Sequence, residues 1–211
     1  MRDEERGDAA AVPRLIEGPQ VEGPQVGGPQ VKGPQVKGPQ VEGPLVKRVA
    51  GVLYPDEARW AWVLDELTRL WGTPDLVSKP VPFTMTDYYR DIAPFLLRRF
   101  VCLPALADAG GLADWKRQSR EIEGRSRAPV RAVNIDPGYV DGARLVLAST
   151  KDHAHRIWLR DGIYAEVTLR WRFGKWESFD YTFPDFRSGV YDGFLSAARR
   201  LWLEERRASR A

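Results

Sequence analysis

The segment at residues 148–159, ASTKDHAHRIWL, gathers side chains that could do chemistry between two apolar runs. Lys151, His155 and Arg156 supply nitrogen donors within six residues, directly after the hydroxyls of a Ser-Thr pair. Proteins hold phosphate with arginine forks, the point charge of lysine, and hydroxyl or amide donors. The spacing therefore predicts an anion-binding site in this segment.

Two other interpretations of the segment stay open. Asp152, His153 and His155 offer a carboxylate and two imidazoles, and a His-x-His pair on a strand turns both rings to one face, as a metal site needs. Because His153 falls in an expected turn, where the direction of the ring is not fixed, we assign no metal. The structural alternative is the polar end of a strand, with His155 bonded to a backbone carbonyl.

Carboxylates form the second group of candidates. Glu166 has apolar neighbours in the run YAEVTLRW, and a carboxylate in such surroundings needs a partner. With Asp136 and Asp185 it could serve a metal or acid–base chemistry. An ion pair with Arg156 or Arg131 is the structural version of the same observation. The predicted ligand-binding residues are Arg131, Asp136, Lys151, His155, Arg156 and Glu166.

The elements that must position these side chains follow from hydrophobic periodicity. Apolar residues at three- and four-residue spacing are typical of helices. Helices are expected at residues 55–72, 111–126 and 188–210. Strands are expected at residues 47–54, at residues 96–103, and in five β-rich runs between residues 130 and 183. Asp-Pro-Gly, Asp-Gly and Phe-Gly-Lys are expected to be turns. Strict alternation in the run from residue 164 to residue 171 places Glu166 and Thr168 on one face, and Val167 and Leu169 on the other.

The order of these elements predicts an α+β fold. Strands and helices that do not alternate regularly favour a mixed, mostly antiparallel sheet, with helices packed on one face. We expect a single domain over residues 47–211, because 43% of the chain is hydrophobic and can form a core.

Residues 1–46 are expected to form a separate, disordered tail. From Glu17 the chain repeats a five-residue unit six times, as EGPQV EGPQV GGPQV KGPQV KGPQV EGPLV. Each unit pairs glycine with proline, and one valine per unit cannot offset the entropy cost of ordering the chain. A ligand for a groove-binding protein partner is the alternative role for this repeat.

Charge and composition narrow the function classes. Residues 1–46 hold five Lys/Arg and seven Asp/Glu, so the remaining 27 Lys/Arg and 22 Asp/Glu give +5. This small basic excess permits an anionic ligand but does not favour a nucleic-acid partner. No apolar run could span a bilayer and no secretory signal is present, so we expect a cytoplasmic protein away from membranes. The single cysteine, Cys102, is expected to be a buried structural thiol.

The block from Arg131 to Asp185 resembles a known family. In order it contains NIDPGY, LVLASTKD, HRIWL, GIYAEVTL and YTFPDF, and GVLY and FTMTDYY precede it. Over residues 48–202 the chain is similar to the bacterial family catalogued as domain of unknown function 4416, although RDIAP at residues 90–94 departs from its pattern. The resemblance implies an uncharacterised activity. A P-loop GTPase is disfavoured, because the chain lacks G-x-x-x-x-G-K-[ST].

Two functions from different classes remain. The first is a protein that binds a phosphorylated small molecule or nucleotide through the basic and histidine cluster. The second is a noncatalytic interaction or scaffold domain that presents aromatic side chains to a protein partner; these are Trp158, Trp171, Trp176 and Phe179. No motif assigns a reaction or a cofactor, and no Ser-His-Asp order supports covalent hydrolysis.

Overall fold

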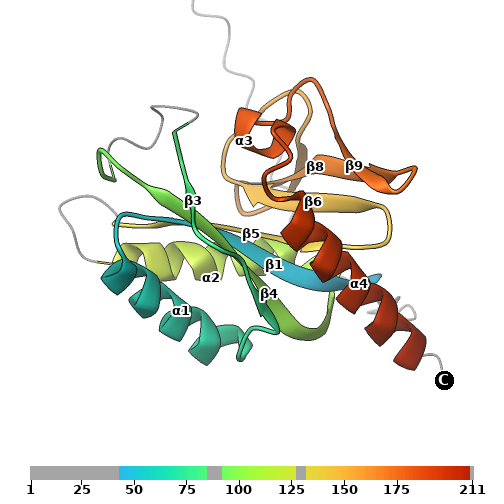
Figure 1. The fold of residues 1–211 in the computed structure, drawn as a ribbon, viewed down its shortest axis with the longest axis horizontal. Coiled ribbons are helices and arrows are strands. Elements are labelled where there is room, and N and C mark those ends of the chain that lie inside the picture. The colour runs from blue at the N-terminus through green and yellow to red at the C-terminus, as the bar shows by residue number, and fades with distance from the viewer. Residues whose placement is uncertain (1–42, 85–91, 127–131, 210–211) are drawn as a thin grey trace, which may run out of the picture. The chain divides into compact units, whose positions relative to one another are not determined.

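The computed structural model describes residues 43–84, 92–126 and 132–209 (Figure 1). Its strands are β1 (Leu45–Tyr54), β2 (Leu76–Val77), β3 (Val81–Pro82), β4 (Leu97–Asp108), β5 (Asn134–Val140), β6 (Arg144–Ser149), β7 (Ile157–Arg160), β8 (Ile163–Arg172) and β9 (Lys175–Ser178). Its helices are α1 (Glu57–Trp71), η2 (Ala109–Gly111, a 3-10 turn), α2 (Leu112–Arg125), α3 (Pro184–Arg187) and α4 (Asp192–Ala208).

The strands form one sheet in the order β2-β4-β1-β5-β6-β8-β7, with β3 also paired to β4 and β9 to β8. Every strand pair within the described residues is antiparallel. The predicted class, α+β with a mostly antiparallel sheet, is confirmed. Strand β1 begins at Leu45, so the last two residues of the segment expected as a tail belong to the sheet.

Helix α1 begins and ends at residues whose types predict these positions. The side chain of Asp56 accepts a hydrogen bond from the backbone N–H of Arg59 at 2.8 Å, which satisfies one free donor of the first turn. Gly72 ends the helix with φ 91°, a conformation that favours glycine. Between these residues, Trp60, Val63, Leu67 and Trp71 face the core.

Helices cover both faces of the sheet, whereas the sequence analysis expected them on one. Helices α1 and α2 pack on one face, and α3 and α4 pack on the other, each over its own apolar cluster. Figure 1 shows α4 in front of the sheet and α2 behind it. The central strands explain the difference: β1 and β4 are nearly continuous apolar runs, which is the pattern of strands buried on both sides.

The Asp-Pro-Gly sequence is not a turn, contrary to our expectation. Asp136, Pro137 and Gly138 all lie within β5 and pair with β1. Strand β6, in contrast, pairs with β5 only over Gly138–Val140. Proline has no backbone N–H to donate, so the ladder to β6 cannot continue through Pro137. Strands β5 and β6 therefore part at this point and form a fork in the sheet.

A register shift in β8 overturns the predicted strict alternation. The shift lies opposite Leu145 and Val146, where one extra residue of β8 is accommodated. Val167 packs with the α1/α2 cluster, but Leu169 packs with the α3/α4 cluster. Glu166 and Thr168 stay on one face, as alternation predicts, and line the same cavity, described below, whereas Leu169 departs from the alternation.

The buried-thiol prediction for Cys102 is confirmed. The side chain is inaccessible to solvent, and burial raises the pKa of the thiol to about 12. Within the described residues, no helix has the length and apolar character needed to cross a membrane.

Candidate functional site

The open edge of β5 at the fork is closed by side chains of α2. The backbone N–H of Ile135 donates to Glu123 Oε1 at 2.6 Å, and Lys116 Nζ donates to the carbonyl oxygen of Ile135 at 2.7 Å. Both charged side chains are buried. Glu123 and Lys116 thus bond the backbone N–H and C=O of Ile135, which a neighbouring strand would otherwise pair. Strands β5 and β6 can therefore separate here without leaving these backbone groups of β5 unsatisfied.

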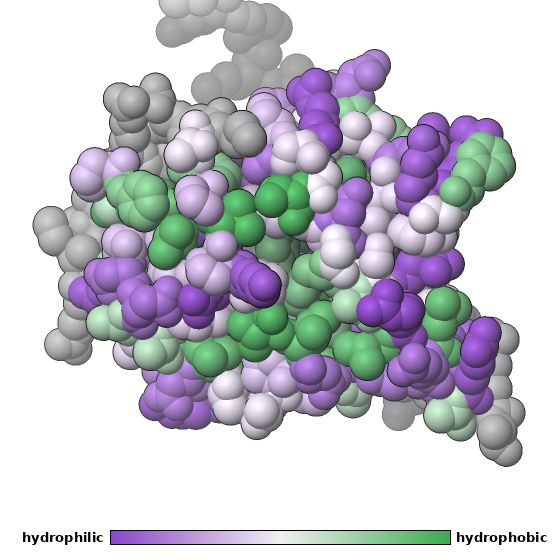
Figure 2. All heavy atoms as spheres, in the orientation of Figure 1, coloured by the Kyte–Doolittle hydropathy of each residue, from purple (hydrophilic) through white to green (hydrophobic). Residues whose placement is uncertain are grey.

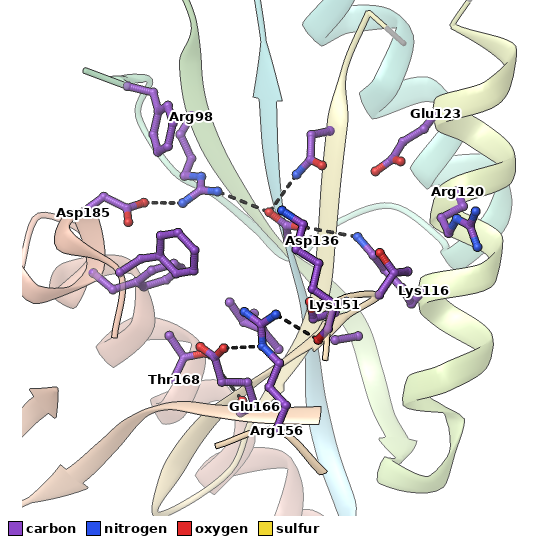
Figure 3. Close-up of a pocket in the computed structure, with 18 of the residues that line it drawn as sticks. Arg98, Lys116, Arg120, Glu123, Asp136, Lys151, Arg156, Glu166, Thr168 and Asp185 are labelled. Atoms are coloured by element: carbon purple, nitrogen blue, oxygen red, sulfur yellow. Dashed lines mark hydrogen bonds and ion pairs between the residues drawn. The ribbon is translucent and has the colours of Figure 1, made fainter. Parts of the chain in front are cut away.

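A cavity of about 490 Å³ lies at this fork, within the size range of small-molecule sites. Side chains from α2, β4, β5, β6, β8, α3 and the segment before β7 line it (Figure 3). Its cations are Arg98, Lys116, Arg120, Lys151 and Arg156. Its carboxylates are Glu123, Asp136, Glu166 and Asp185. Among the lining residues that the structure describes, five positive and four negative groups give a formal charge of +1.

Arg98 links two carboxylates on the β4 and α3 side of the cavity. Its guanidinium forms an ion pair with Asp185 and donates to Asp136 Oδ2 at 3.2 Å. Tyr191 also donates to Asp185 Oδ2, at 3.1 Å. The guanidinium lies 4.8 Å from the ring centroid of Phe83. These contacts fix Arg98 in a buried position.

Asp136 lies between Arg98 and Lys116, as Figure 3 shows. Lys116 Nζ is 3.3 Å from Asp136 Oδ1, and the amide of Asn134 donates to Oδ2 at 2.8 Å. Burial alone would raise the pKa of Asp136, but Lys116, Arg98 and Asn134 together outweigh burial and lower the pKa below its usual value. The carboxylate is therefore ionised at neutral pH.

Glu166 is the centre of a second group, on β8. It is 4% exposed, and Oε2 accepts from Arg156 Nε at 2.8 Å. His155 Nε2 lies 3.1 Å from the same oxygen, and Thr168 Oγ1 donates to Oε1 at 3.2 Å. The structure thus contains the ion pair between Glu166 and Arg156 that the sequence analysis offered as the structural interpretation.

Two cations of the lining retain donors for a ligand. Arg120 is exposed on α2, one turn after Lys116, and makes no ion pair with any residue that the structure describes. Arg156 uses Nε for Glu166 and Nη1 for the carbonyl oxygen of Lys151, at 3.0 Å. Its Nη2 has no hydrogen-bond partner among the described residues.

The structure brings four of the six predicted site residues together: Asp136, Lys151, Arg156 and Glu166 line one cavity. His155 does not line it, and instead contacts Glu166 and stacks on Tyr181 with ring centroids 4.1 Å apart. Arg131 lies outside the described residues.

The contribution of α2 and β4 to the cavity was not predicted from the sequence. Lys116, Arg120 and Glu123 are spaced by four and three residues, so they share one helix face, and that spacing was a usable signal. Arg98 stands beside Arg99 at the start of a mostly apolar strand, where a charged side chain needs a partner. Asp185 was grouped in the sequence analysis with the other candidate carboxylates, and in the structure its partner is Arg98.

The metal interpretation gains no geometric support. In the described ranges, no three His, Cys, Asp or Glu side chains are grouped so that they could hold a metal ion. The rings of His153 and His155 stack 5.7 Å apart, at an interplanar angle of 13°.

The proposed aromatic surface is not continuous. Trp158 on the edge strand β7 is 60% exposed, but Trp176 is buried, and Trp171 and Phe179 are only partly exposed. Elsewhere, Figure 2 shows apolar side chains on both sides of a hollow near the middle of the face that carries α4.

Comparison with known proteins places the chain in a family. The model of the family described as domain of unknown function (DUF4416) matches residues 44–202. The chain belongs to this family. The matched range contains the fork and every described residue of the cavity lining, so the site lies within the DUF4416 domain. No curated protein and no solved structure matches the chain.

Proposed function

We propose that the cavity at the fork binds a phosphorylated small molecule or a nucleotide. The observation that carries the proposal is the cationic side of the cavity, where Arg120 has no ion-pair partner among the described residues and Arg156 keeps one nitrogen unengaged. Lys151 and the hydroxyl residues Ser149 and Thr150 line the same cavity. Arginine forks, a lysine charge and hydroxyls are the donors that phosphate needs.

The carboxylates of the lining do not offset the preference of the cavity for phosphate, because each already has a partner. Asp136 and Asp185 share Arg98, while Glu166 pairs with Arg156 and Glu123 accepts from the backbone of β5. The formal charge of +1 that remains on the described part of the lining favours an anion. The apolar part of the wall, formed by Phe83, Phe183 and Phe186 among others, fits the carbon skeleton of a small organic ligand.

The test is isothermal titration calorimetry on the full chain with inorganic phosphate, sugar phosphates and nucleotides. Arg120→Ala should weaken the binding of any phosphate ligand by about tenfold or more, as expected for a lost charged hydrogen bond. Arg117→Ala is the matched control, because Arg117 lies on the same helix but pairs with Asp114 and does not line the cavity. Equal affinities for the two variants would contradict the proposal.

One observation favours the alternative, a noncatalytic interaction role. Ile157 and Trp158 are 67% and 60% exposed on β7, the last strand of the sheet. Exposed apolar residues on an edge strand invite pairing with a strand of another chain. Sedimentation equilibrium of the full chain tests self-association through this edge. A dimer that Trp158→Lys dissociates would support it, and a monomer at all concentrations would exclude it.

A further inference from the structure

The two sides of the cavity differ in chemistry, and this limits how a phosphate ester can lie in it. On the β4 and α3 side, Asp136 and Asp185 present carboxylates. An ionised carboxylate repels a phosphate group at short range. A phosphate is therefore disfavoured beside Asp136 and Asp185. On the other side, Arg120, Lys151 and Arg156 outnumber the carboxylates Glu123 and Glu166, so the phosphate is placed with these three cations.

The carboxylate side is neutral when taken as a group. Asp136 and Asp185 carry two negative charges, and their ion-pair partners Arg98 and Lys116 carry two positive charges. An ammonium group bound here would lack a counter-charge, so charge balance favours neutral hydrogen-bond donors. Asp185 Oδ1 accepts no hydrogen bond from a described residue, whereas Oδ2 is used by Arg98 and Tyr191. Hydroxyl groups are the neutral donors that suit such acceptors.

Aromatic rings complete this side of the cavity. The guanidinium of Arg98 lies 4.8 Å from the Phe83 ring centroid and 5.5 Å from that of Phe186. Phe183, at the start of α3, also lines the cavity and is 42% exposed. A ring or chain that carries both hydroxyls and C–H groups meets both the acceptors and the apolar wall.

We propose that the ligand is a hydroxyl-rich phosphate ester, with its phosphate at Arg120, Lys151 and Arg156 and its hydroxyls at Asp136 and Asp185. This inference rests on the proposed function, because it assumes that the cavity holds a phosphate. The ester belongs either to a free sugar phosphate or to the ribose phosphate of a nucleotide, which share this chemistry.

The experiment compares four probes by calorimetry on the full chain: ribose 5-phosphate, AMP, methyl phosphate and ribose. Methyl phosphate has the phosphate without hydroxyls, and ribose has the hydroxyls without phosphate. Ribose 5-phosphate or AMP should bind at least about tenfold more tightly than methyl phosphate, since the hydroxyl contacts add to the phosphate contacts. Tighter binding of AMP than of ribose 5-phosphate identifies a nucleotide as the source, and the reverse identifies a free sugar phosphate.

Asp136→Asn should change the affinity for methyl phosphate and the preference for hydroxylated esters in opposite directions. The variant keeps the shape of the side chain but removes the charge, so methyl phosphate should bind more tightly while the preference for hydroxylated esters falls. Phe183→Ala changes an exposed side chain and tests the same side without breaking an ion pair. It should weaken ribose 5-phosphate and leave methyl phosphate unchanged, and Phe173→Ala, 81% exposed at the β8–β9 turn, is its control.

The failures of the two proposals are distinct. Methyl phosphate binding as tightly as every hydroxylated ester would overturn the inference and leave the phosphate site standing. Absence of binding by all phosphate probes would overturn both. An unchanged ratio of affinities in both Asp136→Asn and Phe183→Ala would also overturn the inference, even if the wild-type preference were present.

Discussion

At the scale of single residues, the buried pair of Glu166 and Arg156 makes the sharpest prediction. Their side chains are 5% and 6% exposed, so Glu166→Gln leaves the guanidinium with a neutral partner in a buried position. Removal of one partner of such a pair costs about 3 kcal/mol in the free energy of unfolding. Urea denaturation should show this loss, and Arg156→Met in the same chain should restore part of it.

The control is the exposed ion pair of Glu177 and Arg170, whose arginine is 46% exposed. Glu177→Gln should change the free energy of unfolding by less than about 1 kcal/mol, because water screens the pair. Equal losses in Glu166→Gln and Glu177→Gln would show that burial does not set the strength of the Glu166 pair.

The lowered pKa of Asp136 predicts that the free energy of unfolding depends on pH. Its pKa is lower in the folded chain than its ordinary value of 3.8, so its ionised form stabilises the folded state at neutral pH. This contribution is present above pH 3.8 and is lost as the pH falls through the folded-state pKa. The difference in free energy of unfolding between wild type and Asp136→Asn should therefore be largest near neutral pH and shrink in acid.

Urea denaturation across a pH series measures this difference. Asp152→Asn is the control, because Asp152 is exposed and its carboxylate forms no ion pair with a described residue. Its stability curve should run parallel to that of the wild type. A constant difference between wild type and Asp136→Asn at all pH values would contradict the prediction.

At the scale of elements, the end of the β5–β6 ladder depends on Gly138. A Cβ atom there would lie 2.2 Å from the carbonyl oxygen of Val146 and 2.6 Å from a methyl group of Leu147. Because the nearest atom is backbone, the strands must move apart, and Gly138→Ala should cost about 2 kcal/mol or more of unfolding free energy. Thermal and urea unfolding measure the loss.

Gly124→Ala provides a comparison with the opposite sign. Gly124 lies in the last turn of α2, and no heavy atom would lie within 4 Å of the added Cβ. Alanine should therefore stabilise the chain by up to about 1 kcal/mol through its helix propensity. A destabilised Gly124→Ala, or a neutral Gly138→Ala, would contradict this account of the two positions.

The elements predicted correctly are those with local signals. Helix α1 has its cap, its apolar spacing and its terminal glycine within the segment itself. The fork could not be predicted, because Asp-Pro-Gly reads as a turn unless the pairing of β5 with β1 is known. The Glu166–Arg156 pair was accessible from nearby charges, whereas the partners of Arg98 are 38 and 87 residues away in the chain. Long-range partners of this kind follow from the sheet order and not from spacing.

At the scale of the whole molecule, the N-terminal repeat should be dispensable for folding. The repeat offers one valine per five residues between glycine and proline, so we expect it to bury little apolar surface. Deletion of residues 1–42 should leave the free energy of unfolding unchanged within about 0.5 kcal/mol. A larger loss in urea denaturation would show that the repeat contributes to the folded domain.

The fork has a mechanical consequence. Only three residue pairs join β5 to β6, so the sheet consists of two plates, one built on β1 and β4 and the other on β6 and β8, with a short seam between them. Asp136 belongs to the first plate, and Glu166, with its partner Arg156, to the second. A ligand bound in the cavity as proposed would therefore contact both plates. The distance between the plates would then limit the length of such a ligand, in addition to the limit that charge sets.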